Sequence, residues 1–374
     1  MPLIADLLGD TGGYSACIAQ QINLFQTSDR LQSEHLICGK IICCMETDPN
    51  SITASPPRMI SSFVNGFNIV ASHIYLILFP IFLDLLLWFG PHLRVNNLMQ
   101  PVIKDMVNSI QTMGSPDMSQ MALLAQTVWQ TTLERFNLLS LLHTIPVGVP
   151  SLLVSVSPLK TPLGNAPLLE LSSVGVIVGL WLLLILFGLI LASLYFDSIS
   201  RCILQEKKAF SVKMAARATL QIILLNVILI GIGLILFIPV TLMVSIITLL
   251  SPFLAQIFLL LIALFLLWLL VPLIFTPHGI FYNQQNVLAA ILNSIRLVRF
   301  FLPGTGLFLL MAILLGQGLD VLWRVPAENS WMILVGIAGH AFISTGLLAA
   351  SFAYYSSGMR RMQDTIKNVN TAGL

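Results

Sequence analysis

The chain has 374 residues, of which 57% are hydrophobic and only 9% are charged. An ordinary soluble domain has about 25% charged residues. The composition therefore excludes a soluble globular protein, a disordered chain and a nucleic-acid-binding domain. The formal net charge of +2 indicates no particular class of partner.

Charged residues are missing altogether between residues 219 and 295. A helix needs about 20 apolar residues to cross a bilayer whose hydrocarbon core is about 30 Å thick, and a backbone in hydrocarbon must satisfy its own hydrogen bonds. The pattern predicts an all-α polytopic transmembrane bundle of six spans, with the third span kinked at Pro239. The predicted spans are 69–89, 174–196, 220–250, 253–275, 304–323 and 331–355.

The basic residues favour a topology with both termini in the cytoplasm, because Lys and Arg accumulate in cytoplasmic loops. After position 45, this topology places eleven basic residues inside and five outside. A seventh span at 136–156 would reverse the later loops, and Pro146 and Pro150 would interrupt its helix. We therefore expect a loop at 136–156. The densest basic cluster, which then faces the cytoplasm, consists of Arg201, Lys207, Lys208, Lys213 and Arg217.

Three regions follow from these spans: an N-terminal tail at 1–68, a transmembrane domain at 69–357 and a cytoplasmic tail at 358–374. Residues 1–44 have no long apolar run and no basic stretch typical of a signal peptide. We expect the functional protein to begin at Met45 and the tail at 1–68 to be disordered. Its cysteines lack the paired spacing of a zinc site, so the sequence predicts neither a metal site nor structural disulfides.

The outer loop at 90–173 contains two stretches with helical spacing of apolar residues, one at 102–110 and one at 121–136. A turn at 114–117 separates them. Two amphipathic helices are therefore expected to cap the outer end of the bundle or to lie in the headgroup layer.

The loop at 277–303 predicts an interfacial cytoplasmic helix. Arg296 and Arg299 lie off its apolar face and are placed to meet lipid phosphates, as are Lys207 and Lys208 in the preceding cytoplasmic loop. The predicted partner is the bilayer itself, in particular anionic lipids; a protein partner or a homo-oligomer is left open. The apolar face consists of Leu288, Ile291, Leu292, Ile295 and Val298.

Three ionisable residues fall inside predicted spans. Helical rise places Asp84, Asp320 and His340 about 9, 6 and 13 Å below the outer boundary, where they could bind a cation or relay protons. In the alternative, Asp320 pairs with Arg324 at i,i+4, Asp84 reaches toward the headgroups and His340 donates to the backbone. An aromatic belt at the same boundary is expected from Trp88, Trp323 and Trp331.

Small residues spaced four apart, at Gly175 and Gly179 and at Gly346 and Ala350, predict faces on which helices approach closely. The sequence contains no phosphate-binding loop, no zinc-protease motif and no nucleophile elbow. We therefore expect no enzyme activity and no cofactor.

The stretch Phe275-Thr276-Pro277, followed by an amphipathic helix with Ala290, Ser294 and Arg299 and then a Gly-rich entry to the next span, resembles a known membrane domain. It is the bacterial six-span membrane domain of glycerophosphodiester phosphodiesterases, together with its stand-alone relatives. The likeness covers about residues 174–357. It implies a protein of a bacterial plasma membrane that lacks the phosphodiesterase barrel, and it transfers no catalytic residue.

Three functions follow as hypotheses. The first is a non-enzymatic role in membrane organisation or lipid handling, indicated by the basic interfacial segments. The alternative is a secondary transporter or permease-like subunit that uses Asp84, Asp320 and His340. An intramembrane enzyme is a third, weaker hypothesis.

Overall fold

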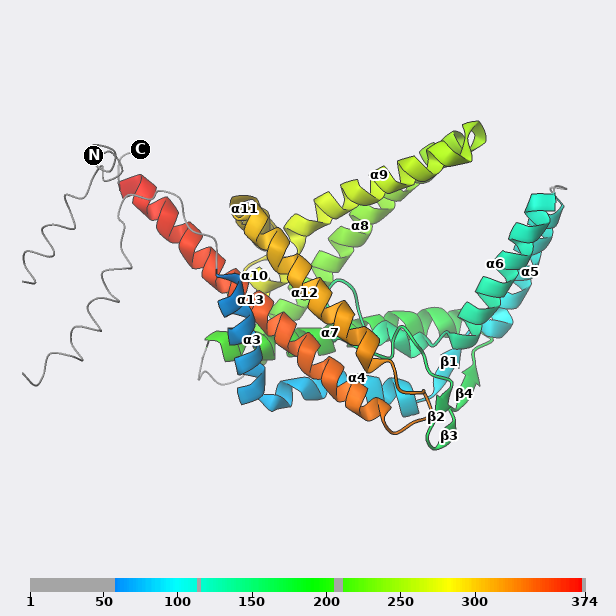
Figure 1. Ribbon diagram of the computed structural model, residues 1–374, viewed down its shortest axis with the longest axis horizontal. Coiled ribbons are helices and arrows are strands. Elements are labelled where there is room, and N and C mark those ends of the chain that lie inside the picture. Colours follow the sequence, from blue (N-terminus) through cyan, green and yellow to red (C-terminus); the bar gives the residue numbers. More distant parts are fainter. Residues whose placement is uncertain (1–57, 113–115, 205–210, 372–374) are drawn as a thin grey trace, which may run out of the picture. The chain divides into compact units, whose positions relative to one another are not determined.

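The computed structural model describes residues 58–112, 116–204 and 211–371, and most of them are helical (Figure 1). They belong to one compact unit, Ser55–Leu374. The expectations for residues 1–44, for a start at Met45 and for Lys207 and Lys208 lie outside the described residues.

The long helices carry the fold. Two short parallel strands, β1 (His92–Arg94) and β4 (Leu168–Glu170), and a small antiparallel pair, β2 (Lys160–Thr161) and β3 (Gly164–Asn165), complete it. The α-helices are α3 (Met59–Ser72), α4 (Leu78–Phe89), α5 (Asn96–Gln111), α6 (Pro116–Arg135), α7 (Val174–Leu204), α8 (Val212–Leu250), α9 (Pro252–Leu270), α10 (Thr276–Tyr282), α11 (Val287–Phe300), α12 (Leu302–Trp323) and α13 (Ile333–Thr371). Short 3-10 helices are η2 (Ile74–Ile77), η3 (Leu138–Leu142) and η4 (Val271–Leu273).

Five helical segments are long and apolar enough to cross a membrane, or six if a bent pair near the start is one span. The five are α7, α8, the continuous segment Pro252–Tyr282, α12 and α13. The all-α polytopic fold predicted from the sequence is therefore confirmed. These helices define the chain as an integral membrane protein.

The first predicted span is wrong in its form. Instead of one helix at 69–89, α3 ends at Ser72, and the helix from Ile74 to Phe89 leaves at an angle of 92° (Figure 1). His73 breaks the helix, with φ −129° and ψ 60°, and its ring Nδ1 bonds the carbonyl of Ile69 at 3.1 Å. The helix also begins at Met59, within the segment predicted to be a disordered tail.

The longest helices differ from the prediction mainly at their ends. α8 runs as one helix through Pro239, and the segment beginning at Pro252 continues to Tyr282, past the predicted end. α13 continues to Thr371, so most of the predicted C-terminal tail extends the last helix. None of the residues in the most apolar windows of α8 and of Pro252–Tyr282 is buried inside the protein. We assign these surfaces to lipid, since apolar side chains that are not buried in the protein require an apolar solvent.

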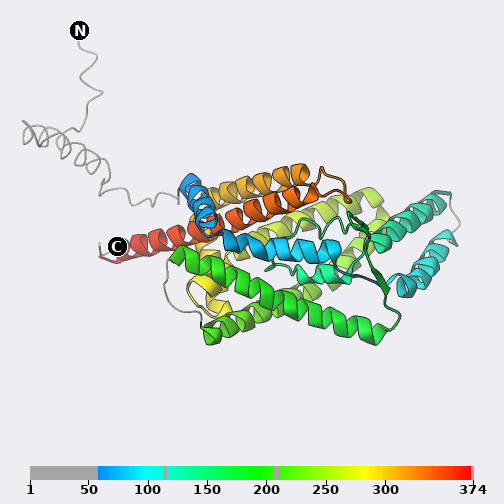
Figure 2. The ribbon, with the colours of Figure 1, turned by 90° about the horizontal axis from the view of Figure 1, so that it is seen from below.

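α13 is the packing centre of the bundle. It lies along α3 and α12, and it also contacts α4, α7, α10 and α11 (Figures 1 and 2). The α3–α13 contact depends on small residues, because a Cβ added at Gly66 would lie 2.3 Å from the backbone nitrogen of Ala350. One added at Gly346 would lie 2.4 Å from the ring of Phe67. The predicted packing face at Gly346 and Ala350 is confirmed.

The other predicted small-residue face has no packing role among the described residues. A Cβ at Gly179 would meet nothing within 4 Å, and one at Gly175 would touch only Ser173. The four-residue spacing of small residues therefore marks a helix contact at Gly346 and Ala350, but an open surface at Gly175 and Gly179.

The segment between α4 and α7 forms the two predicted amphipathic helices, α5 and α6, which pack against each other. Residues 136–156 form no spanning helix, as predicted, and enter the core of the bundle instead. The buried apolar side chains of this stretch are Leu138, Leu139, Leu142, Val147, Val149, Leu152 and Leu153.

Polar contacts join α4 and the end of α6 to the connection between α12 and α13. Arg135 forms an ion pair with Glu328 at 2.8 Å, and Trp88 donates to the Glu328 carbonyl at 3.0 Å.

Burial, together with the charge of Arg94, lowers the pKa of His92 in β1 below its ordinary value of 6.5. His92 is therefore neutral at pH 7 and adds no positive charge to this end of the molecule.

Candidate functional site

Asp320 and His340 meet at the interface of α12 and α13. The Nδ1 atom of His340 lies 2.6 Å from Oδ1 of Asp320, and Arg324 lies 3.5 Å from the other carboxylate oxygen. Asp320 is 9% exposed and His340 is 8% exposed. The carboxylate is thus shared between a ring nitrogen on the next helix and the predicted i,i+4 arginine.

Asp84 is held by a different set of groups. Its carboxylate accepts hydrogen bonds from the Ser151 hydroxyl at 2.5 Å and from the backbone amides of Leu152 and Leu153, both at 3.1 Å. The side chain is fully buried. Asp84 therefore anchors the loop at 151–153 to α4, and it does not reach toward the headgroups.

The surroundings of Asp84 and of Asp320 lie against the same part of α13. Leu152 lies 3.6 Å from a Cβ built at Gly336, and the ring of Trp323 covers Gly339. Trp88 and Trp331, both expected at the outer boundary, contact each other edge to face with ring centroids 6.1 Å apart. Sequence reasoning thus placed these groups in one layer of the bundle, but only Asp320 and His340 share a hydrogen bond.

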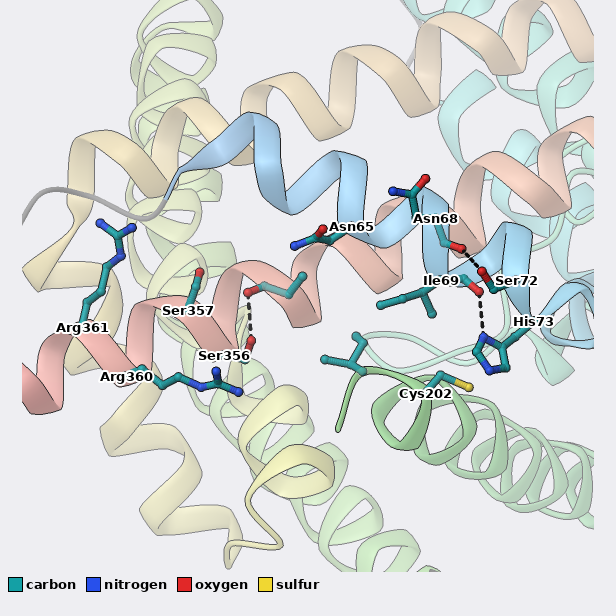
Figure 3. Close-up of a pocket in the computed structure, with 12 residues that line it drawn as sticks. Asn65, Asn68, Ile69, Ser72, His73, Cys202, Ser356, Ser357, Arg360 and Arg361 are labelled. Carbon is teal, nitrogen blue, oxygen red and sulfur yellow. Dashed lines mark hydrogen bonds between the residues drawn. The ribbon is translucent and has the colours of Figure 1, made fainter. Parts of the chain in front are cut away.

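A separate polar pocket of about 660 Å³ lies between α3, the end of α7 and the second half of α13 (Figure 3). None of Asp84, Asp320 and His340 lines it. In Figure 3, Asn65 and Asn68 on α3 and Ser356 and Ser357 on α13 border one space, with arginines toward one end of it and His73 toward the other. The lining residues are Asn65, Asn68, Ile69, Ser72, His73, Cys202, Ile203, Ala353, Ser356, Ser357, Arg360 and Arg361.

The charged side chains among the described residues that line the pocket are basic. Arg360 and Arg361 are consecutive on α13, and none of the described residues that line the pocket is Asp or Glu. Arg360 donates to the hydroxyl of Tyr282 at 3.3 Å. Positive charge, with no carboxylate among the described lining residues, favours an anionic ligand.

Sequence reasoning missed this pocket, although a signal was present. Asn65, Asn68 and Ser72 lie at i, i+3 and i+7, which places three polar side chains on one face of a helix. That face was overlooked because the first predicted span began at residue 69.

A second hollow, of about 440 Å³, lies where α11 meets the end of α13. It is lined by both predicted lipid-contacting arginines, Arg296 and Arg299, together with Phe300, Met362 and Ile366. Both arginines are exposed. The hollow therefore offers two guanidinium groups beside an apolar wall.

α11 is confirmed as a helix, but it has two apolar faces. The face predicted to be apolar includes Leu288 and Leu292, which are 66% and 53% exposed. A neighbouring face packs into the protein, where the Ser294 hydroxyl donates to the Pro272 carbonyl at 2.6 Å and accepts from the Phe275 amide at 3.1 Å. The buried residues of this face are Val287, Ala290, Ser294, Leu297 and also Val298, which the prediction assigned to the first face.

Within the described residues, no group of three or more His, Cys, Asp or Glu side chains could hold a metal ion. No family model, curated protein or solved structure matches the chain. The likeness to the membrane domain of glycerophosphodiester phosphodiesterases stays a prediction from the sequence. The class that the fold defines is a polytopic α-helical membrane protein.

Proposed function

We propose that this protein binds anionic phospholipids at the end of the bundle formed by α11 and the second half of α13, and that it acts in membrane organisation or lipid handling without catalysing a reaction. The observation that carries the proposal is the hollow in which Arg296 and Arg299 lie beside Phe300, Met362 and Ile366. A phospholipid requires this combination, because its phosphate pairs with guanidinium groups and its acyl chains need apolar contacts.

The length of α13 supports a position at the headgroups. From Trp331, at the expected outer boundary, to Met362 there are 31 residues, which span about 46 Å at 1.5 Å per residue. A bilayer is about 40–45 Å thick with its headgroups included. If one end of α13 lies at one membrane surface, the hollow then lies at the opposite surface.

The proposal includes the orientation in which both termini are cytoplasmic and the membrane is the plasma membrane of a bacterium. Its support is the excess of Lys and Arg in the predicted cytoplasmic segments. In this orientation the hollow faces the cytoplasmic leaflet, whose anionic lipids attract basic side chains.

Removing the two arginines tests the proposal. The full chain is placed in nanodiscs of phosphatidylcholine with increasing phosphatidylglycerol, and bound lipid is counted by native mass spectrometry. We expect R296Q/R299Q to weaken retention of phosphatidylglycerol about tenfold or more, since each basic residue near an anionic surface contributes about 1 kcal/mol.

The matched control is K104Q/K160Q, which removes the same charge from exposed positions on α5 and β2. Its lipid retention is expected to equal that of the wild type. Equal retention by R296Q/R299Q and the wild type would contradict the proposal, and so would an equal loss in both double variants.

The transporter alternative has weaker support. The Asp320–His340 pair is buried and hydrogen-bonded, and both of its side chains can bind a proton. However, Asp84 is occupied by three donors from the 151–153 loop, and the 660 Å³ pocket lies elsewhere. We therefore propose lipid binding over transport.

A further inference from the structure

The polar pocket between α3, α7 and α13 has a lining that differs from that of the Arg296–Arg299 hollow. The hollow combines arginines with apolar side chains, whereas the pocket combines arginines with amides and hydroxyls. Its volume of about 660 Å³ falls in the range of about 300–1,000 Å³ found for small-molecule sites. The pocket is therefore large enough for a polar group bigger than phosphate alone.

One end of the pocket is suited to phosphate. The guanidinium of Arg360 has five N–H donors, and its one hydrogen bond among the described residues goes to Tyr282. Arg361 follows directly in the sequence and borders the same space (Figure 3). Planar guanidinium groups bind phosphate oxygens through paired, charge-assisted hydrogen bonds.

The remainder of the pocket is suited to hydroxyl groups. The carboxamides of Asn65 and Asn68 make no hydrogen bond to any described residue, so each offers a carbonyl acceptor and an NH₂ donor. Ser356 and Ser357 donate their protons to the carbonyls of Ala353 and Tyr354. Their oxygens are left as acceptors for ligand hydroxyls.

His73 closes the far end of this lining. Its Nδ1 atom is bonded to the carbonyl of Ile69, so Nδ1 carries the proton and Nε2 is an acceptor in the neutral ring. The pocket thus presents neutral donors and acceptors, beside the apolar side chains of Ile69, Ile203 and Ala353, and positive charge toward one end (Figure 3). A bare phosphate, or a phosphate carrying only acyl chains, has no polyol hydroxyl groups to pair with these neutral groups.

We infer that this pocket binds a phosphate ester whose organic part carries several hydroxyl groups. Two sources share this chemistry, namely a phospholipid with a polyol headgroup and a free polyol or sugar phosphate. About 33–45 Å separate Trp331 from the pocket residues of α13 by helical rise, a distance that places the pocket near the headgroups and within reach of both sources.

The test compares two anionic phospholipids, one with a headgroup rich in hydroxyl groups and one whose headgroup is phosphate alone. The full chain in phosphatidylcholine nanodiscs is given phosphatidylinositol or phosphatidic acid, and binding is measured by native mass spectrometry. We expect a preference of about tenfold for phosphatidylinositol. The preference is expected to be lost in N65A/N68A while binding of phosphatidic acid is unchanged, and binding of phosphatidylinositol is expected to fall about tenfold in R360Q/R361Q.

Two further variants separate binding from folding and from the proposed function. R360K/R361K keeps the charge and should retain part of the binding, which a misfolded protein would not. R296Q/R299Q should keep the preference for phosphatidylinositol even though its general retention of anionic lipid falls. Failure of R296Q/R299Q to lower that retention would overturn the proposed function without touching this inference.

Soluble inositol 1-phosphate and inorganic phosphate distinguish the sources. Competition by inositol 1-phosphate, but not by inorganic phosphate, supports a free phosphate ester as the ligand. A preference for phosphatidylinositol that neither probe displaces supports the lipid. Equal binding of the two lipids without competition by inositol 1-phosphate would overturn the inference, as would full preference in N65A/N68A.

Discussion

At the scale of single residues, ionisable groups inside an apolar chain are structural as much as functional. Asp84 is fully buried, and its three donors come from residues 67 to 69 positions further along the chain. A partner at i,i+4, such as Arg324 for Asp320, could be predicted from helical spacing. The partners of Asp84 could not, because nothing local specifies which loop returns to α4.

Replacing Asp84 with Asn should destabilise the bundle. An amide oxygen can accept from some of the three donors, but the NH₂ group faces donors and leaves at least one of them unpaired. A buried unpaired donor costs about 1–3 kcal/mol, so we expect D84N to lower the thermal unfolding midpoint in detergent, and D84A to lower it further. D105N, at an exposed position on α5, is the control. An unchanged midpoint for D84N would show that the carboxylate does not anchor the loop.

At the scale of helices, the local apolar pattern predicted well which segments are helical. It predicted poorly where a helix breaks. Helix α11 and the pair α5 and α6 appear where apolar spacing placed them. The break at His73 was missed because the apolar pattern continues from Ile69 to Phe89 across it. The bend accompanies the packing of α3 on α13, a contact between residues almost 300 positions apart that no sequence window contains.

Because α3 and α13 approach closely, replacing Gly66 should destabilise the protein. A Cβ at Gly66 would lie 2.3 Å from the backbone nitrogen of Ala350, so the helices must separate to admit it. Overpacking of this kind costs about 1–3 kcal/mol, and we expect G66A to lower the unfolding midpoint. G179A is the matched control, because it adds a methyl group to an open position in α7 and alanine favours a helix by about 1 kcal/mol over glycine. Equal midpoints for the two variants would contradict this account of the contact.

At the scale of the whole molecule, the distribution of charge carries most of the information in the sequence. The long uncharged stretch located α8 and α9, and the scarcity of charge elsewhere located α7, α12 and α13. The polar pocket escaped prediction because its walls come from three separate helices, and only their packing brings Asn65, Cys202 and Arg360 around one space (Figure 3). Membrane-spanning helices can be predicted from composition, whereas a pocket between helices depends on how those helices pack.

In the topology proposed above, the basic end of the bundle, with Arg296 and Arg299, faces the cytoplasmic leaflet. The most direct test of this topology is cysteine accessibility in intact cells, using a background in which all five native cysteines are serine. Lys160 in β2 and Lys213 in α8 are exposed and lie on opposite sides in the proposed topology. With a membrane-impermeant maleimide, K160C should be labelled in intact cells and K213C only after permeabilisation. Labelling of K213C in intact cells, with K160C protected, would contradict the account.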